Sequence, residues 1–319
     1  MKTNFLHITT ISILGLLMFA CGKPSTPDLV SFKQAALYPE GVEYDPASKS
    51  FLVTSLREGT VGKVSDDGSY RAFINNDKMV SAIGIRIDHS GDRVLVCNSD
   101  PGASKHTKKE TQGKLAGLGV YKLSSGELIK YIDLGELSAG GHFCNDIALD
   151  AAGNAYITDS FSPIIYKLDT NYNASILLNN PRFVGKGFNL NGLVVKDDYL
   201  LVAKYNEGIL FKVPLQSPEN FTQVDISTSM SGADGLLWLE DGSLMVIANA
   251  NTNKIFTLAS SDDWTSAKVV DSRDTGNVFA TTGVVRDGSA YILNAMLHVL
   301  FNADTTSHIE TFEINKYKK

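Results

Sequence analysis

Four short motifs in this chain place an oxygen-bearing side chain just before a glycine or an apolar strand. They are Glu40-Gly41, Asn145-Asp146, Asn191-Gly192 and Asp234-Gly235. Carboxylate and amide oxygens are the donors that hard divalent cations prefer, whereas zinc more often takes sulfur or imidazole. If the four first-named side chains converge, they form a divalent-cation site, with Ca²⁺ favoured and Mg²⁺, Mn²⁺ or Zn²⁺ as alternatives.

The elements that would bring these residues together form an internal repeat. Units of two short apolar runs separated by an Asp- or Gly-containing turn begin near residues 41, 84, 145, 191, 234 and 282. Each unit has the pattern strand, hairpin, strand, and further strands follow. Six such units of about 45 residues predict an all-β fold, a six-bladed β-propeller, with an open β-sandwich as the competing architecture.

The last unit supplies three strands, expected near residues 283–286, 290–293 and 309–314. We therefore expect residues 29–37 to provide its outer strand, so that an N-terminal strand closes the ring. The predicted propeller extends over residues 29–319.

Propeller topology then predicts a polar ring at one mouth of the central channel. The first strand of a blade starts at one face and the second strand returns to it, so the residues that open first strands lie near those that end second strands. The second set comprises Ser55, Asn98, Asp159, Lys204, Asn249 and Asn294. One motif alone is explained as well by a turn, because Asn-Gly and Asp-Gly suit positive φ. Four motifs in register favour the cation site.

The connection between residues 99 and 119 is longer than its counterparts and contains several lysines. Long loops in compact domains often serve as lids or binding segments. A disordered surface loop is the alternative.

The N-terminus has the pattern of a secretory signal. Lys2 precedes an apolar run over residues 8–20, which is too short to span a bilayer and ends at Cys21. The segment Met18-Phe19-Ala20-Cys21 resembles a bacterial lipobox, so residues 1–21 are expected to be a lipoprotein signal peptide and residues 22–28 a tether. Lipidation of Cys21 would hold an exported protein at a membrane, in the periplasm or at the cell surface, through the lipid alone. A short uncleaved anchor is the alternative.

Composition limits the remaining choices. The 319 residues carry a formal net charge of −6, which argues against a nucleic-acid partner because such proteins usually present a strongly basic face. Beyond Cys21, the sequence contains only Cys97 and Cys144. They either pair in an oxidising compartment or remain two buried thiols.

With these motifs in order on six repeats, the chain over roughly residues 29–316 resembles the senescence marker protein/gluconolactonase-like (regucalcin-like) family of six-bladed propellers. The resemblance implies that Glu40, Asn191 and Asp234 bind the metal directly, and that Asn145 contacts the metal or the substrate. It also implies a cation that polarises the carbonyl of a lactone or related ester, which water attacks.

Within that implied mechanism, Asp234 and Asp159 are the candidate catalytic bases. Asn145, Lys204, Asn98 and Asn249 are the candidate substrate-binding residues. His142 is a further acid or base candidate, or else a structural histidine.

The chain departs from the family where a sugar lactonase often has an arginine, because Phe143 stands two residues before Asn145. Recognition of a sugar acid is therefore in doubt, and a more apolar lactone or ester is an alternative. A non-catalytic propeller that binds a carbohydrate or peptide in the cell envelope is the second functional hypothesis.

Overall fold

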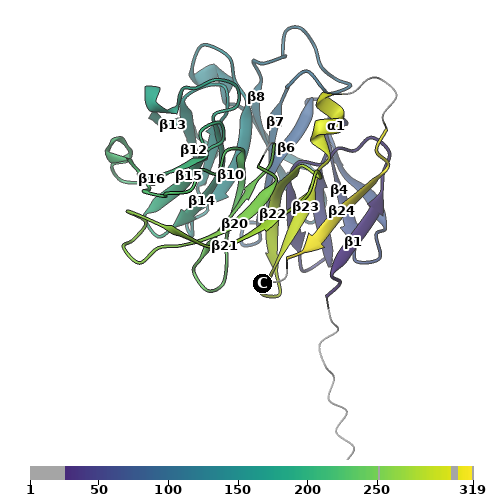
Figure 1. Ribbon diagram of the computed structural model, residues 1–319. Helices are drawn as coiled ribbons and strands as arrows, with labels where there is room; N and C mark the ends of the chain where they lie inside the picture. The colour runs from purple at the N-terminus through teal and green to yellow at the C-terminus, as the bar shows by residue number, and fades with distance from the viewer. Residues whose placement is uncertain (1–25, 251, 303–307, 318–319) are drawn as a thin grey trace, which may run out of the picture.

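The computed structural model describes residues 26–250, 252–302 and 308–317. The expected signal peptide, Cys21 and most of the tether lie outside the described residues. The described part forms six four-stranded antiparallel sheets, which we number as blades in chain order. Figure 1 shows the blades arranged around a common centre.

The first three blades are each built from four consecutive strands. Blade 1 contains β2 (Val42–Asp45), β3 (Ser50–Thr54), β4 (Thr60–Ser65) and β5 (Tyr70–Asn75). Blade 2 contains β6 (Ser81–Asp88), β7 (Arg93–Ser99), β8 (Ala116–Lys122) and β9 (Leu128–Asp133). Blade 3 contains β10 (Cys144–Leu149), β11 (Ala155–Asp159), β12 (Ile164–Leu168) and β13 (Ala174–Asn179).

Two of the remaining blades follow the same order, and the sixth combines both ends of the described chain. Blade 4 contains β14 (Leu190–Lys196), β15 (Tyr199–Lys204), β16 (Ile209–Pro214) and β17 (Thr222–Gln223). Blade 5 contains β18 (Ala233–Trp238), β19 (Leu244–Ala248), β20 (Lys254–Ala259) and β21 (Lys268–Asp274). Blade 6 contains β22 (Ala280–Arg286), β23 (Ser289–Asn294), β24 (Thr311–Lys316) and β1 (Leu29–Lys33).

The N-terminal strand closes the ring, as the sequence predicts. Strand β1 pairs antiparallel with β24 from Leu29 opposite Asn315 to Lys33 opposite Thr311. Its burial alternates, with Val30 and Phe32 in the core and their neighbours exposed. An edge strand with one buried face is what this alternation predicts.

The core lies between neighbouring sheets. Between blades 4 and 5, for example, Leu201 and Leu210 pack with Leu236 and Val246, and all four side chains are buried. Strands buried on both faces have nearly continuous apolar runs, as β19 does. A single blade therefore gains its core from its neighbours.

Three short 3₁₀ helices lie in connections, at Gly135–Leu137, Pro181–Phe183 and Pro218–Asn220. One short α-helix, α1 (Leu297–Phe301), follows β23. No helix within the described ranges has the length and apolar character needed to cross a membrane.

The connection over residues 100–115 is folded around one carboxylate. Asp100 is buried and accepts hydrogen bonds from the backbone N–H of Gly102 at 2.9 Å and from the hydroxyls of Thr107 and Thr111 at 2.7 Å each. An ion pair between Lys105 and Glu58 attaches the segment to blade 1. Its lysines do not line the cavity described below.

Cys97 and Cys144 form a disulfide, with their Cα atoms 5.3 Å apart. Of the two alternatives that the sequence leaves open, the structure therefore has the paired one. The bond joins β7 of blade 2 to the first residue of β10 in blade 3. It therefore fixes the start of the strand that carries Asn145.

Candidate functional site

The innermost strand of most blades is irregular at the same point. The pairing of β10, β14 and β18 with their neighbours shifts between Cys144 and Ile147, between Leu190 and Leu193, and between Ala233 and Leu236. The two residues inside each shift are the Asn-Asp, Asn-Gly or Asp-Gly of a motif. A β-bulge of this kind redirects a side chain, and here it directs the first residue of each motif toward the central channel.

Close packing of inner strands explains the glycines in the motifs. A Cβ atom on Gly192 would lie 2.1 Å from the carbonyl oxygen of Asp234, and one on Gly235 would lie 2.7 Å from that of Thr281. Neither glycine has positive φ. The turn explanation for these two motifs is therefore wrong, because the glycines serve the close approach of adjacent blades.

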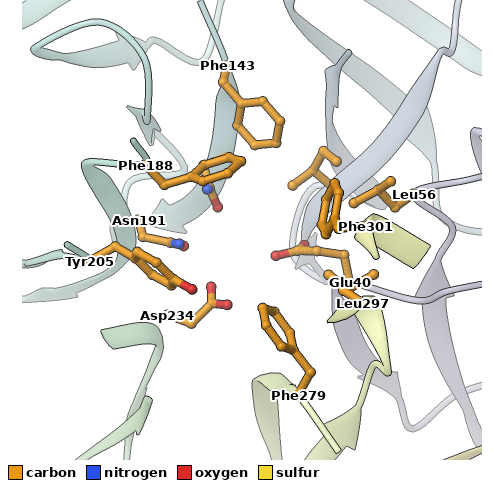
Figure 2. Close-up of a pocket in the computed structure, with 12 residues that line it drawn as sticks. Glu40, Leu56, Phe143, Phe188, Asn191, Tyr205, Asp234, Phe279, Leu297 and Phe301 are labelled. Atoms are coloured by element: carbon orange, nitrogen blue, oxygen red, sulfur yellow. The ribbon is translucent and has the colours of Figure 1, made fainter. Parts of the chain in front are cut away.

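The structure brings the four predicted ligands to one cavity. Glu40, Asn145, Asn191 and Asp234 all line it, and each side chain is buried. A second, narrower space of about 10 Å³ lies against the same four residues within the channel. Figure 2 shows the side chains of Glu40, Asn191 and Asp234 directed toward one another across the cavity.

Two oxygens in this group lack a hydrogen-bond partner. Among the described residues, Glu40 Oε2 and Asn145 Oδ1 are buried and accept no hydrogen bond. The orientation of Asn145 is fixed because its Nδ2 donates to Ser160 Oγ at 2.7 Å, and Ser160 Oγ donates to the Leu190 carbonyl at 2.5 Å. Buried polar atoms are nearly always partnered, so these two acceptors at one cavity are available to a bound water, ligand or cation.

Asp234 is held by two amides. The Asn249 side chain donates to Asp234 Oδ2, and its own Oδ1 accepts a hydrogen bond of 2.7 Å from the Tyr205 hydroxyl. Asn191 also hydrogen-bonds the Asp234 carboxylate. Asn249 therefore positions Asp234 without lining the cavity itself.

The electrostatics of the group are unfavourable without a positive charge. Burial, together with the charge of Asp146, raises the pKa of Asp234 to about 8, although the hydrogen bonds from Asn249 and Asn191 act to lower it. Burial also raises the pKa of Glu40 well above its usual value, and the charges of Asp234 and Asp146 add to that effect. Two buried carboxyls that repel each other hold protons unless a cation offsets their charge.

The donor set fits a hard divalent cation. It offers two carboxylates and two amide groups, with orphaned oxygens on Glu40 and Asn145. In the part of the chain that the structure describes, no three His, Cys, Asp or Glu side chains form a metal cluster on their own. Any cation here would therefore depend on amide oxygens, as Ca²⁺ and Mg²⁺ sites commonly do.

Asp159 lies near the same mouth but outside the cavity. Its carboxylate is fully buried and accepts hydrogen bonds from Phe143 N at 2.8 Å and from the Tyr166 hydroxyl at 2.9 Å. The backbone N–H groups of Phe161 and Ser162 also donate to it. These partners occupy both oxygens, and the catalytic role expected for Asp159 stays a prediction that its surroundings do not favour.

His142 is the fifth partner of that carboxylate. Its Nδ1 lies 2.8 Å from Asp159 Oδ2, and its Nε2 lies 2.9 Å from the Ser138 carbonyl oxygen. The hydrogen bond to Asp159 raises the pKa of the imidazole. Both ring nitrogens are occupied, and His142 does not line the cavity, which agrees with the structural alternative.

Two other residues that we expected to contact substrate instead hydrogen-bond to backbone groups. Lys204 is buried, and its Nζ donates to the carbonyls of Arg182 and Val184 at 2.9 and 3.0 Å and pairs with Glu207 at 2.6 Å. Asn98 is buried as well. It accepts from Val80 N at 2.8 Å and donates to the Lys78 carbonyl and the Tyr131 hydroxyl. Neither residue lines the cavity.

The cavity walls are apolar. Eight of its twelve lining residues carry an apolar or aromatic side chain, namely Leu56, Ile83, Phe143, Phe188, Tyr205, Phe279, Leu297 and Phe301. Of these, only Phe143 is a position that we considered from the sequence. A usable signal was present, because Phe143, Phe188 and Phe279 each stand two or three residues before the channel position of their blade.

Comparison with known proteins finds the fold and no sequence family. No family model matches the chain, and no curated protein matches it. Solved structures do match. The allergen Mala s 1 of Malassezia sympodialis has 16% sequence identity, a TM-score of 0.73 and alignment over 92% of this chain and 96% of its own.

Two enzymes have the same fold at similarly low sequence identity. A gluconolactonase of Xanthomonas campestris has 12% identity and a TM-score of 0.61 over 91% of this chain and 89% of its own. A luciferin-regenerating enzyme has 14% identity and a TM-score of 0.61 over 90% of this chain and 95% of its own. At such identities the likeness establishes the propeller fold, and it does not assign the chain to the regucalcin-like family.

Proposed function

We propose that this protein is a metal-dependent hydrolase of lactones or related esters. The observation that carries the proposal is the pair of orphaned acceptors, Glu40 Oε2 and Asn145 Oδ1, beside a second buried carboxylate in one cavity. The fold shared with a gluconolactonase is consistent with this chemistry. Because a propeller hosts many functions, the argument depends on the site.

Glu40, Asn145, Asn191 and Asp234 would hold the cation, with Ca²⁺ the leading candidate. When bound there, the cation would act as a Lewis acid on the substrate carbonyl oxygen. Asn145 is already oriented for contact with cation or substrate, because Ser160 fixes its amide. The apolar walls would limit the water that enters beside the substrate.

Asp234 is our candidate general base. A base works best with a pKa near the working pH, and burial moves the pKa of Asp234 in that direction. Asn249 and Asn191 hold its carboxylate in place to accept a proton from the attacking water. A direct bond to a cation would weaken Asp234 as a base, so the two roles compete.

The cavity size favours an enzyme over a non-catalytic peptide-binding propeller. The cavity volume is about 60 Å³, and by the same measure one water needs a cavity of about 10–15 Å³. A small molecule fits this space, and a peptide segment would need a broader surface.

The test is hydrolysis of a lactone panel by the intact protein. Activity should disappear with a chelator, return with Ca²⁺ or Mn²⁺, and be lost in Asp234→Ala. Asp77→Ala, which removes an exposed carboxylate outside the cavity lining, is the matched control and should retain activity. A folded protein that hydrolyses no lactone with any cation would refute the hydrolase assignment.

We also propose that the protein is an exported lipoprotein anchored through Cys21. The Cys97–Cys144 disulfide supports export, because structural disulfides persist in oxidising compartments. Thr26, Pro27 and Asp28 contact blade 6, and β1, which follows them, begins at the end of the blade away from α1 (Figure 1). An anchor attached there would leave the cavity facing away from the membrane.

Cys21→Ala should move the protein from the membrane fraction to the soluble fraction, and unchanged membrane retention would count against the anchor.

A further inference from the structure

The cavity has two chemically different parts. Its polar part consists of the four carboxylate and amide side chains, and the rest of the lining is apolar or aromatic. Figure 2 shows Phe143, Phe188 and Tyr205 on one side and Leu56, Leu297 and Phe301 on the other. A substrate whose carbonyl contacts the polar part must therefore place its remaining atoms between apolar walls.

These walls provide almost no hydrogen bonds for a polyol. The Tyr205 hydroxyl is the polar atom of the walls, and it already donates to Asn249. A buried hydroxyl without a partner costs free energy, so each hydroxyl of a sugar lactone would weaken its binding. Polyols are therefore poor candidates for this space.

The first wall is built to hold rings in fixed positions. Phe143, Phe161 and Phe188 pack as a triangle, with centroid separations of 5.2, 5.3 and 5.1 Å. Tyr205 extends the row at 6.3 Å from Phe188. Aromatic pairs favour separations of about 4.5–7 Å, and a wall already packed in this way loses little entropy when a ligand binds.

Helix α1 supplies the facing wall. Leu297 and Phe301 are four residues apart, so they project from one side of the helix. Leu297 is buried, whereas Phe301 is 45% exposed and forms the edge of the mouth. Phe279 closes the third side and stacks on His298, which belongs to the same helix.

The volume sets the size of the group that fits. About 60 Å³ is several times the space of one water, so a six-membered ring would fill the enclosed part of the cavity and reach its open mouth. A larger substituent would have to extend past Phe301 into solvent.

We infer that the cavity takes an ester or lactone that contains a single aromatic ring next to its carbonyl-bearing part, with Phe188 and Phe301 as specificity-determining residues. This inference rests on the proposed hydrolase function and names its substrate class. The ring lies between the two walls, and the carbonyl lies on Glu40, Asn145, Asn191 and Asp234.

The experiment compares three lactones with the intact protein and Ca²⁺: 3-isochromanone, δ-valerolactone and glucono-δ-lactone. The first two are six-membered lactones with an alcohol leaving group, and the first has a fused aromatic ring. We expect kcat/KM for 3-isochromanone to exceed that for δ-valerolactone by about tenfold or more, because the fused ring adds contacts with the aromatic walls. Phe188→Leu and Phe301→Leu should reduce that ratio severalfold. Val184→Ala, an exposed residue outside the lining, should not change it.

Equal kcat/KM for the aromatic and aliphatic lactones, or a preference for glucono-δ-lactone, would overturn the inference while leaving the hydrolase proposal intact. A binding measurement separates the two proposals if no lactone is turned over. Calorimetric titration would compare β-tetralone, in which CH₂ replaces the ring oxygen of 3-isochromanone, with cyclohexanone. Preferential β-tetralone binding that Phe188→Leu weakens about tenfold supports the aromatic site without hydrolysis. No preference overturns the inference.

Discussion

Asp159 and Asp234 lie near the same mouth of the propeller, but their surroundings are opposite. Asp159 accepts hydrogen bonds from three backbone N–H groups, from Tyr166 and from His142. Among the described residues, the Asp234 carboxylate has the amides of Asn249 and Asn191 as partners, and it lies beside a second buried carboxyl, Glu40, which has an orphaned oxygen. The chain itself satisfies the Asp159 carboxylate, whereas the group around Asp234 and Glu40 keeps an acceptor that no described residue pairs.

The difference separates structural from functional polar residues better than position does. The order of strands in a blade predicts that both aspartates lie at the same mouth. Position alone therefore does not tell a structural aspartate from a functional one. Hydrogen-bond satisfaction distinguishes them, because a structural carboxylate is paired by its own chain. Substitutions in the two groups should therefore affect stability and cation binding differently.

Asp159→Ala should destabilise the fold by about 3 kcal/mol, because it leaves several buried donors unpaired. Chemical denaturation measures the loss, and Asp159→Asn should have a smaller effect because it preserves the shape of the side chain. A variant that unfolds normally but has lost hydrolysis would instead show that Asp159 is catalytic.

Glu40→Gln should weaken divalent-cation binding about 100-fold, because it removes a charge and nearly preserves the geometry. Without cation, the same variant should be at least as stable as the parent, since a repelling carboxyl is gone. Calorimetry and thermal melts in chelator measure the two effects. Unchanged cation affinity would mean that Glu40 is not a ligand.

Stability in chelator should fall as pH rises from 5 to 8. The folded-state pKa of Asp234 is raised to about 8 from an ordinary 3.8, so the folded protein binds a proton that the unfolded chain has already lost. The stability this contributes is complete below the unfolded pKa and lost as pH rises through the folded pKa.

Thermal melts in chelator should therefore show a lower Tm at pH 8, by several degrees, since 1 kcal/mol shifts the Tm of a large domain by about 2–4 °C. Asp234→Asn should flatten this dependence. Identical slopes in parent and variant would rule out Asp234 as its source.

Ser160→Ala should weaken cation binding about tenfold. This is the smaller of the effects usually seen when a metal ligand loses the hydrogen bond that orients it. Ser160 contacts the site only through the Asn145 amide, so the cation preference should stay the same. Full affinity in this variant would mean that Asn145 needs no orienting partner or is not a ligand.

The repeat made the architecture and the convergence of Glu40, Asn145, Asn191 and Asp234 predictable. Both follow from strand periodicity and blade spacing, which the chain expresses locally. The closing strand was predictable for the same reason, because the last unit lacks a fourth strand in its own segment.

The roles of Lys204 and Asn98 could not be predicted in this way. They depend on which carbonyls the connecting segments present to them, such as those of Arg182 and Lys78. The α1 wall was missed because its residues lie in a connection, where no repeat constrains the sequence.

Because β1 pairs with β24, blade 6 cannot be completed until the last strand of the propeller has been synthesised. Blade 6 receives its outer strand from the start of the propeller and its other three strands from the end. A nascent chain that stops short of β24 therefore lacks a strand of blade 6 and leaves β1 without its pairing strand. Such intermediates are open to aggregation until the last strand emerges from the ribosome. A circular permutant that opens the chain within residues 100–115 and joins the natural ends would make blade 6 contiguous and remove that delay.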